Sequence, residues 1–377
     1  MILNQEQQMI RDSVRAFAAE RLAPHAAQWD RDCSFPREQL GEMAAMGLLG
    51  VTVPERWGGA GLDYVSLAVA LEEIAAGDGA TSTIASVQAL VCNIFNGYAS
   101  DTQKERYLKP LARGEMLGCF CLTEPQVGSD AGAITTRAER DGADYVLNGV
   151  KQFITSGKNA GVAVVFAVSD KSAGKKGISA FIVPTDAAGY VVTHIEDKLG
   201  QHASDTAQIA FEHCRVPAAN LLGAEGMGYR IALSNLEGGR ICIAAQSVGM
   251  ARAAFEAALK YAHERVSFGK PIIEHQAVNF RLADMATQIE VARQMVLHAA
   301  TLRDAALPCL KEASMAKLFA SEMAERVCSD AIQIHGGYGY VSDFPVERIY
   351  RDVRVAQIYE GASDIQRLVI GRALAGA

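Results

Sequence analysis

Several features that define whole classes of protein are missing from this sequence. Its eight cysteines are scattered among apolar residues, and no two of them form a C-x-x-C pair. This spacing argues against a disulfide framework and against a zinc site, so we expect buried reduced thiols and no metal. No apolar run is long enough to cross a bilayer, so no membrane span is predicted.

Clusters of basic residues are also absent. The net charge is −7 and no dense run of Lys or Arg occurs, which argues against nucleic acid as a partner. The beginning of the chain has neither the basic and apolar regions of a secretory signal nor the Arg-rich character of a transit peptide. We therefore expect a cytoplasmic protein, or a protein of an organelle matrix if the chain is a mature form.

The familiar catalytic signatures are missing as well. The chain contains no G-x-G-x-x-G, no Walker G-x-x-x-x-G-K, no H-E-x-x-H and no G-x-S-x-G. The motif S-x-x-K occurs at 172–175 and 314–317, but without its S-D-N or K-T-G companions it is a chance match. The reactive groups must therefore be sought outside these motifs.

The first 118 residues follow a helical pattern. Asn4 and Gln7 fit a capping box ahead of a run with apolar residues at helical spacing, and Pro24 is expected to end that helix. Further helical runs, separated by Gly and Pro, extend to about residue 112. We predict an N-terminal helical domain over residues 1–118.

Residues 119–225 have a different pattern, with short apolar segments separated by turns. Asp141-Gly142 and Asn148-Gly149 are dipeptides typical of tight hairpins. We predict a compact middle domain built on an antiparallel sheet.

Long helices return over residues 226–377. Apolar residues recur every three, four or seven positions in three successive runs, over 241–266, 282–299 and about 311–335. Long, Ala-rich neighbouring helices form up-and-down bundles, which often bury further apolar stripes against partner subunits. The predicted fold class is therefore α+β, mainly α, with helices, a β domain and helices in that order.

Glycine-marked segments suggest places where the backbone approaches a ligand closely. Residues 121–132, CLTEPQVGSDAG, offer turn amides to a phosphate or a polar ring, but an ordinary loop explains them equally well. Residues 333–340, QIHGGYGY, contain glycines after a long helix, where a helix C-cap is the simpler interpretation. Arg265 and Gln276 fit a solvated charge and a helix start as readily as a ligand site.

A single acid stands out near the end of the chain. In IYEGASDIQR, residues 358–367, Glu360 follows Tyr359 and precedes Gly361. On its own it is explained by a helix start, where a carboxylate interacts favourably with the helix dipole. The histidines show no i, i+4 pairing, which favours structural roles over ligation.

These segments together closely resemble the acyl-CoA dehydrogenase family over essentially the whole chain. In the family's order and spacing, they are LTEPQVGSDAG, NGVKQFITSG, GGRICIAAQSVGMA, ERVSFGKPIIEHQ, AIQIHGGYGY and RDVRVAQIYEGASDIQRLVIGRAL. The short-chain and short/branched-chain members look nearest. The resemblance implies an N-terminal helical domain, a middle β domain and a C-terminal four-helix bundle, in a homotetramer with one non-covalent FAD per subunit.

The resemblance also implies which residues meet FAD. Those beside the flavin would be Phe120, Cys121, Leu122, Thr123, Ser129, Phe153, Ile154 and Thr155. Those that hold the pyrophosphate and adenosine across a subunit boundary would be Arg265, Phe268, Gln276, Gln333, Ile334, His335, Gly336 and Gly337. Next to the acid, the cofactor would touch Ala362, Ser363 and Asp364.

By the same resemblance, Glu360 is the catalytic base. It would remove the α-proton of a CoA thioester while the β-hydrogen leaves as hydride to the flavin, giving the trans-2-enoyl product. The Glu360 amide and the flavin ribityl hydroxyl would polarise the thioester carbonyl, and burial would raise the pKa of the carboxyl toward working pH. The residues expected to face the substrate are Ser129, Glu237, Gly238, Gly239, Arg240, Tyr359 and Gly361.

Some positions depart from the family pattern or allow a second interpretation. A few members carry the base at the position of Gly239, which cannot act here, and Arg240 fits a structural ion pair equally well. Phe153 stands where most members have Trp, and Ala362 replaces a usual Thr. Phe120 stands where some members have Tyr. None of these changes removes a catalytic group.

We therefore predict a FAD-dependent enzyme that dehydrogenates a short-chain acyl-CoA, straight or branched, and passes electrons to electron-transfer flavoprotein. Such an enzyme would serve fatty acid metabolism or branched-chain amino acid degradation. One alternative is a flavin oxidase or monooxygenase on the same fold, which would react rapidly with O₂. Another is a non-catalytic assembly paralogue, against which Glu360 and the near-complete flavin segments argue.

Overall fold

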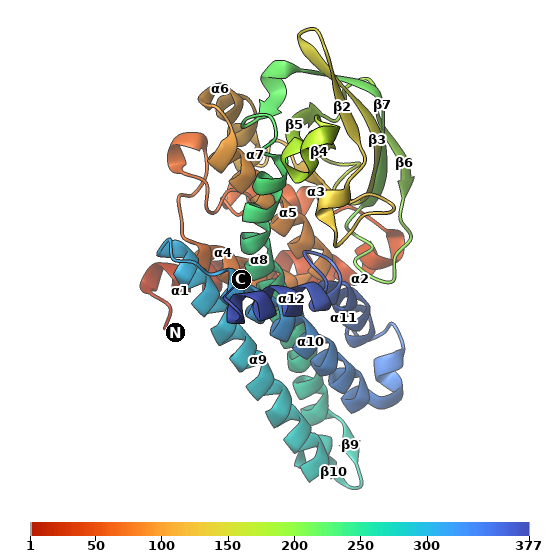
Figure 1. The fold of residues 1–377 in the computed structure, drawn as a ribbon. Helices are drawn as coiled ribbons and strands as arrows, with labels where there is room; N and C mark the ends of the chain where they lie inside the picture. Colours follow the sequence, from red (N-terminus) through yellow and green to blue (C-terminus); the bar gives the residue numbers. More distant parts are fainter. Residues whose placement is uncertain (1, 377) are drawn as a thin grey trace.

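The computed structural model describes residues 2–376. Along the chain a helical region comes first, a β sheet second and another helical region last, while in space the two helical regions pack against each other (Figure 1). The helices of the first region are α1 (Gln5–Phe17), α2 (Ala23–Asp32), α3 (Arg37–Ala45), α4 (Tyr64–Gly77), α5 (Gly79–Tyr98), α6 (Asp101–Gln103) and α7 (Lys109–Ala112). This region follows the helical pattern that the sequence predicts.

The first helix begins at the predicted capping box but does not end where expected. The Gln7 N–H donates to Asn4 Oδ1 at 2.9 Å, and the Asn4 N–H donates to Gln7 Oε1 at 3.1 Å. The expected stop at Pro24 is wrong, because a π-helical turn over Ala18–Leu22 leads directly into α2 with Pro24 in its first turn. A proline inside a helix cannot donate to the preceding turn, and the π-helical turn before it accommodates the missing hydrogen bond.

The middle region is a single sheet. Its strands are β1 (Gly118–Cys121), β2 (Arg137–Asp141), β3 (Asp144–Thr155), β4 (Val162–Val168), β5 (Ile178–Pro184), β6 (Tyr190–Ile195), β7 (Thr206–Pro217) and β8 (Leu221–Leu222). They follow the order β6-β7-β3-β2-β4-β5-β8, with β1 paired to β4. The pairing is mainly antiparallel, as predicted, but β1 and one residue of β2 run parallel to β4. The long connections between these strands allow the chain to return in the same direction.

Only one of the two predicted hairpin dipeptides forms a turn. β2 and β3 join through Gly142, as expected. Asn148-Gly149 instead lies inside β3, where the register against β7 is irregular, so this prediction is wrong. Gly149 has φ +152°, and a Cβ there would lie 2.5 Å from Thr136 Oγ1, while Asn148 Oδ1 accepts the His213 N–H at 2.9 Å. The glycine therefore serves a bulge with close backbone approach.

The last region is a bundle of long helices with a short hairpin at one end. Its elements are α8 (Gly228–Glu264), β9 (Val266–Ser267), β10 (Lys270–Pro271), α9 (Gln276–Asp304), α10 (Leu310–His335), α11 (Val346–Val353) and α12 (Ser363–Leu374). The predicted fold class, mainly helical with a middle sheet, is confirmed. None of the helices within residues 2–376 combines the length and apolar character needed to cross a bilayer.

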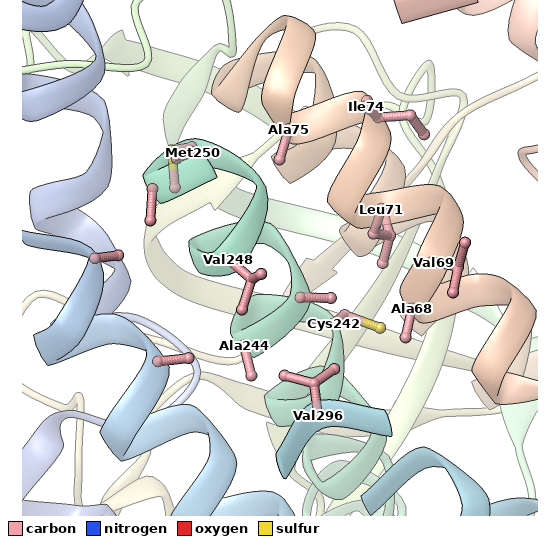
Figure 2. Packing of buried hydrophobic residues seen from close by; sticks show 14 of the residues in the cluster. Ala68, Val69, Leu71, Ile74, Ala75, Cys242, Ala244, Val248, Met250 and Val296 are labelled. Carbon is pink, nitrogen blue, oxygen red and sulfur yellow. The ribbon is translucent and has the colours of Figure 1, made fainter. Parts of the chain in front are cut away.

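The N-terminal and C-terminal helices share one hydrophobic core, although they are far apart in sequence. Figure 2 shows α8 beside α4, with Cys242 and Val248 in the same cluster as Leu71. The two helices are in close contact at Gly249, where a Cβ would lie 2.1 Å from the carbonyl oxygen of Glu72. A small residue at the crossing allows this short separation between the helix axes.

All eight cysteines are free thiols, in agreement with the prediction. Seven are buried, but Cys33 is exposed, so the expectation of burial is wrong for this residue. It ends α2 in the left-handed conformation, with φ +50°, at the surface of the helical region.

Candidate active site

Glu360 lies in a strained turn directly before α12. Its φ is +52° and that of Gly361 is +90°; a left-handed backbone costs a non-glycine residue about 1–2 kcal/mol. The Gln366 amide donates to the carbonyl oxygens of Glu360 at 3.1 Å and Gly361 at 2.8 Å. Lys317 Nζ donates to the same Gly361 oxygen at 2.8 Å. Two buried side chains thus hold the turn in a conformation that it would not favour alone.

The Glu360 carboxylate lies against the backbone of α8. A Cβ built on Gly239 would lie 2.6 Å from Glu360 Oε2, so glycine is needed there for the acid to keep its place. Glu360 Oε2 has no hydrogen-bond partner within residues 2–376. Burial raises the pKa of Glu360 to about 7, although Arg240 and Lys317 act in the opposite direction. The carboxyl group is therefore poised to exchange a proton near neutral pH.

Two buried cations accompany this carboxylate. The Lys317 side chain is 0% exposed, and burial lowers its pKa to about 8. Arg240 is also buried, and its Nε has no hydrogen-bond partner in the described part of the chain. No carboxylate within residues 2–376 lies at ion-pair distance from Arg240, so the structure does not place it in the structural ion pair that the sequence left open.

Tyr359 packs against a buried polar network from three parts of the chain. Thr83 of α5 donates to Gln201 Oε1 at 2.7 Å, and Gln246 of α8 donates to Thr83 Oγ1 at 2.5 Å. Burial raises the pKa of Tyr359 to about 12, so its hydroxyl stays protonated at neutral pH. The Tyr359 hydroxyl lies beside Thr83, Gln201 and Gln246 but has no hydrogen-bond partner within residues 2–376.

The other residues of the predicted substrate group lie in different settings. Glu237 accepts a hydrogen bond from the Cys309 thiol at 2.8 Å and pairs with Arg303 at 3.4 Å. Gly238 lies under the hydroxyl of Tyr64, 2.4 Å from where its Cβ would be. Ser129 is exposed on the loop after β1. The structure therefore gathers Gly239, Arg240, Tyr359 and Gly361 around Glu360, and leaves Ser129 outside this cluster.

The residues predicted to meet the flavin lie where two strands end side by side. Phe120 and Cys121 end β1, Leu122 and Thr123 follow it, and residues 153–155 end β3. The Gln152 N–H donates to the Thr123 carbonyl at 2.9 Å. Phe153 has φ +59° and is 61% exposed. Ile154 and Cys121 point into the sheet core, since both are buried. The strands thus hold a large aromatic ring outward in a strained conformation.

A buried ion pair fixes this loop to the sheet. Lys151 Nζ donates to Glu124 Oε1 at 2.9 Å and to the Leu122 carbonyl at 3.0 Å, and neither charged side chain is more than 1% exposed. The backbone N–H groups of Thr135 and Thr136 also donate to Glu124. Burial disfavours the carboxylate, but Lys151 and Thr136 outweigh it and hold the pKa of Glu124 at about 2.

A second predicted group lies at the end of the bundle remote from the sheet (Figure 1). Arg265 follows α8 and stacks over Tyr338 at 5.9 Å from the ring centroid, and Phe268 at the tip of the β9–β10 hairpin is 94% exposed. The remaining members lie at the start of α9 and the end of α10, namely Gln276, Gln333, Ile334, His335, Gly336 and Gly337. About 40 Å of helix separates Gly239 from Arg265, so one chain does not bring this group to Glu360.

The residues after Glu360 begin α12. Ala362 is the N-cap and provides no side-chain cap, whereas Asp364 lies exposed in the first turn. The Ser363 hydroxyl is buried without a hydrogen-bond partner among the described residues. The helix therefore starts with an unsatisfied N–H group and an unused hydroxyl beside the Glu360 turn.

Replacing Ala362 with Thr is expected to stabilise the protein by about 1 kcal/mol, because a threonine hydroxyl at an N-cap accepts a free N–H of the first turn. Ala362 has φ −55° and ψ 158°, which a threonine adopts without strain. Thermal unfolding would show the gain. Ala362→Val is the matched control, since it has the same shape without the hydroxyl; equal midpoints for the two variants would contradict the capping argument.

Sequence reasoning missed three polar residues of this region: Lys317, Gln366 and Lys151. Lys317 falls on the buried stripe of α10, with Ala313, Ala316 and Ala320 around it. A charged residue on an otherwise apolar stripe is the signal that would have revealed it. Lys317 is also the last residue of the S-x-x-K motif at 314–317, which on sequence grounds alone is a chance match.

Three family models cover almost the whole chain. Those described as Acyl-CoA dehydrogenase N-terminal, middle and C-terminal domain match residues 4–115, 119–214 and 226–375. Together with the fold and the buried acid, they show that the chain belongs to the acyl-CoA dehydrogenase family. Members of this family are FAD-dependent flavoproteins.

Individual relatives are similar over nearly their full length. Short-chain specific acyl-CoA dehydrogenase, mitochondrial, of Rattus norvegicus is 48% identical over 369 residues, covering 98% of this chain and 90% of that protein. The structure of butyryl-CoA dehydrogenase from Megasphaera elsdenii matches with TM-score 0.97 and 40% identity, over 100% of this chain and 99% of that one. A chain in a structure of the electron transferring flavoprotein of Acidaminococcus fermentans matches with TM-score 0.98 and 45% identity, over 99% of both chains.

Proposed function

We propose that the chain is a short-chain acyl-CoA dehydrogenase in which Glu360 removes the α-proton of the thioester. The observation that carries this proposal is the geometry of Glu360: a buried carboxylate with a free oxygen and a pKa raised to about 7. The resemblance in sequence supports the proposal, since the resemblance implies that Glu360 is the family's base. The similarity to a short-chain specific enzyme and to a butyryl-CoA dehydrogenase supports a short acyl chain.

The backbone next to Glu360 is suited to activating the substrate. An α-proton is too weakly acidic for a carboxylate unless hydrogen bonds polarise the thioester carbonyl. Within residues 2–376 no hydrogen bond uses the Glu360 N–H, so this donor is free for the carbonyl oxygen. Gly361 has no side chain to obstruct that approach. Acid and donor therefore belong to one residue, which keeps their relative positions fixed.

The proposed FAD site fits the residues present. The exposed, strained Phe153 offers an apolar face to a planar ring, and the unpartnered Ser363 hydroxyl offers a hydrogen bond. Gly336 and Gly337 leave open backbone, since a Cβ at either position would meet nothing within 4 Å, and a phosphate group can approach there. When bound, FAD accepts the β-hydrogen of the substrate as a hydride.

We further propose that the complete site needs a second copy of the chain. Glu360 and the Arg265 group are too far apart in one chain to hold the same cofactor, whereas two chains packed along their bundles would supply one group each. The exposed side of α9 has a groove of about 770 Å³ lined by Ala286, Val291 and Met295, an apolar surface suited to a partner helix. A homotetramer with cross-subunit sites satisfies both observations.

Electron-transfer flavoprotein is the electron acceptor that we propose, because this chain is similar to a chain found in a structure of such a flavoprotein. The alternative acceptor is O₂, as in a flavin oxidase. Rapid reoxidation of the substrate-reduced protein by air would favour that alternative, and slow reoxidation would argue for the protein acceptor.

The test of the proposed function is an anaerobic titration of the FAD-loaded protein with straight and branched acyl-CoAs of four to eight carbons. We expect the flavin to bleach with the four-carbon thioester and to respond less as the chain lengthens. Succinyl-CoA, which has the same number of acyl carbons as butyryl-CoA but carries a second carboxylate, is the control substrate and should bleach the flavin less than butyryl-CoA. No bleaching with any member of the panel would reject the proposed reaction.

A further inference from the structure

Lys317 is a buried lysine outside the set of site residues that the resemblance in sequence implies. It lies midway along α10, and its side chain has no exposed surface. Its hydrogen bond joins Nζ to the carbonyl oxygen of Gly361 at 2.8 Å. Taking an ammonium group out of water costs several kcal/mol unless other charges compensate, and no carboxylate within residues 2–376 is at ion-pair distance from this one. A purely structural role would be served at lower cost by an apolar side chain.

The charges nearest to Lys317 belong to the Glu360 cluster. Those that face it are the Glu360 carboxylate from the turn, Arg240 from α8 and Glu322 from its own helix. Those that face Glu360 are Arg240 and Lys317, and the ionisable neighbours Tyr359 and Cys242 also feel its charge. Glu237 is a further charge that acts on Arg240. Two buried cations therefore surround one buried carboxylate.

The hydrogen bond of Lys317 acts on the part of the backbone that aims the acid. Lys317 Nζ donates to the carbonyl oxygen of Gly361, and the Gln366 amide donates to the same oxygen and to the carbonyl oxygen of Glu360. These bonds offset the cost of the left-handed backbone at Glu360. Gln366 is neutral, so of these two residues only Lys317 combines the hydrogen bond to the turn with a positive charge beside the carboxylate.

We propose that Lys317 is a positioning residue for the base: its ammonium group holds the Glu360–Gly361 turn and keeps the neighbouring carboxylate ionised for proton abstraction. The inference rests on the proposed role of Glu360. The positive charge lowers the energy of the carboxylate that accepts the proton, and it also favours the negative charge that develops on the thioester as the proton leaves. An apolar residue at 317 would supply neither effect.

The test compares Lys317→Met, which removes charge and hydrogen bond, with Lys317→Gln, which keeps a donor but no charge. We expect the acid limb of butyryl-CoA-dependent flavin reduction to move to higher pH by roughly one unit in both variants. The rate at pH 7 should fall about tenfold or more, and further in Lys317→Met. Lys317→Arg, which restores the charge, should return the acid limb toward its wild-type position. Lys311→Met on the exposed side of α10 is the matched control, and it should change neither the acid limb nor the rate at pH 7.

A second readout follows the Glu360 proton without turnover. The infrared band of the protonated carboxyl, assigned to Glu360 by its loss in Glu360→Gln, should titrate at higher pH in both neutral variants. An unmoved band and an unmoved rate profile would overturn the inference while leaving the base in place. If the variants lose activity only in proportion to their loss of bound FAD or of folded protein, Lys317 has a structural role, and the inference is overturned as well. If wild type itself is not bleached by any acyl-CoA, the proposed function fails instead, and the infrared titration still decides the role of Lys317.

Discussion

Replacing Glu360 with Gln is expected to reduce the rate of butyryl-CoA-dependent flavin bleaching by roughly 10³-fold, the scale on which a positioned general base contributes. Glutamine has the shape of glutamate and still fits against Gly239, so the fold and the FAD content should remain. The amide cannot accept the α-proton. Stopped-flow reduction under anaerobic conditions measures the loss, and the flavin spectrum before mixing measures cofactor retention.

The wild-type protein should also show the titration of this base. Because the base acts when ionised and its pKa is raised to about 7, the reduction rate should increase as the pH rises through 7 and fall as the pH drops below it. Glu139→Gln, which changes an exposed acid on β2, is the control and should keep both the rate and the pH profile. Bleaching of Glu360→Gln at the wild-type rate would show that another group removes the proton.

Replacing Lys151 with Met is expected to destabilise the protein by about 3–5 kcal/mol, because it leaves the buried carboxylate of Glu124 without its cation. The backbone N–H groups of Thr135 and Thr136 still satisfy part of the acid, but they carry no full charge. The loop after β1 should loosen first, since Lys151 also holds the Leu122 carbonyl. Chemical denaturation measured at neutral pH would show the change, and FAD retention should fall with it.

The pH dependence gives this prediction a distinct signature. The pKa of Glu124 is depressed in the folded protein to about 2, so its ion pair contributes stability above the ordinary carboxyl pKa and loses it as the pH falls toward 2. The difference between wild type and Lys151→Met should therefore shrink in acid. Lys158→Met on the exposed surface is the control, and Glu124→Gln/Lys151→Met should recover part of the loss. A difference that stays constant with pH would contradict the ion-pair argument.

Local sequence rules predicted elements of the fold where the residues involved were neighbours in the chain. The capping box of Asn4 and Gln7 formed as expected because both partners lie within one turn. Asn148-Gly149 has the composition of a hairpin turn, yet tertiary contacts with Thr136 and His213 decide its conformation. Pro24 could not be assigned correctly either, since a preceding π-helical turn has no clear signal in the sequence.

The candidate site was predictable only in part, for a similar reason. On local grounds Glu360 is an ordinary acid near a helix start, and only the resemblance to the family led us to predict that it is the base. Its surroundings depend on α8 and α10, which meet it from positions many residues away, so the contact with Gly239 and the hydrogen bond from Lys317 were not accessible from spacing. The buried pair of Lys151 and Glu124 joins β3 to the loop after β1 in the same way.

The core shared by the first and last helices has a consequence for synthesis of the chain. α4 is buried along almost its entire length, and much of what covers it is α8 and its neighbours in the C-terminal bundle. While the ribosome is still making the sheet, the N-terminal helices already lie outside the exit tunnel with their apolar faces uncovered. The nascent chain therefore reaches its final packing only after translation is nearly finished, and until then its first third is the segment most in need of a chaperone.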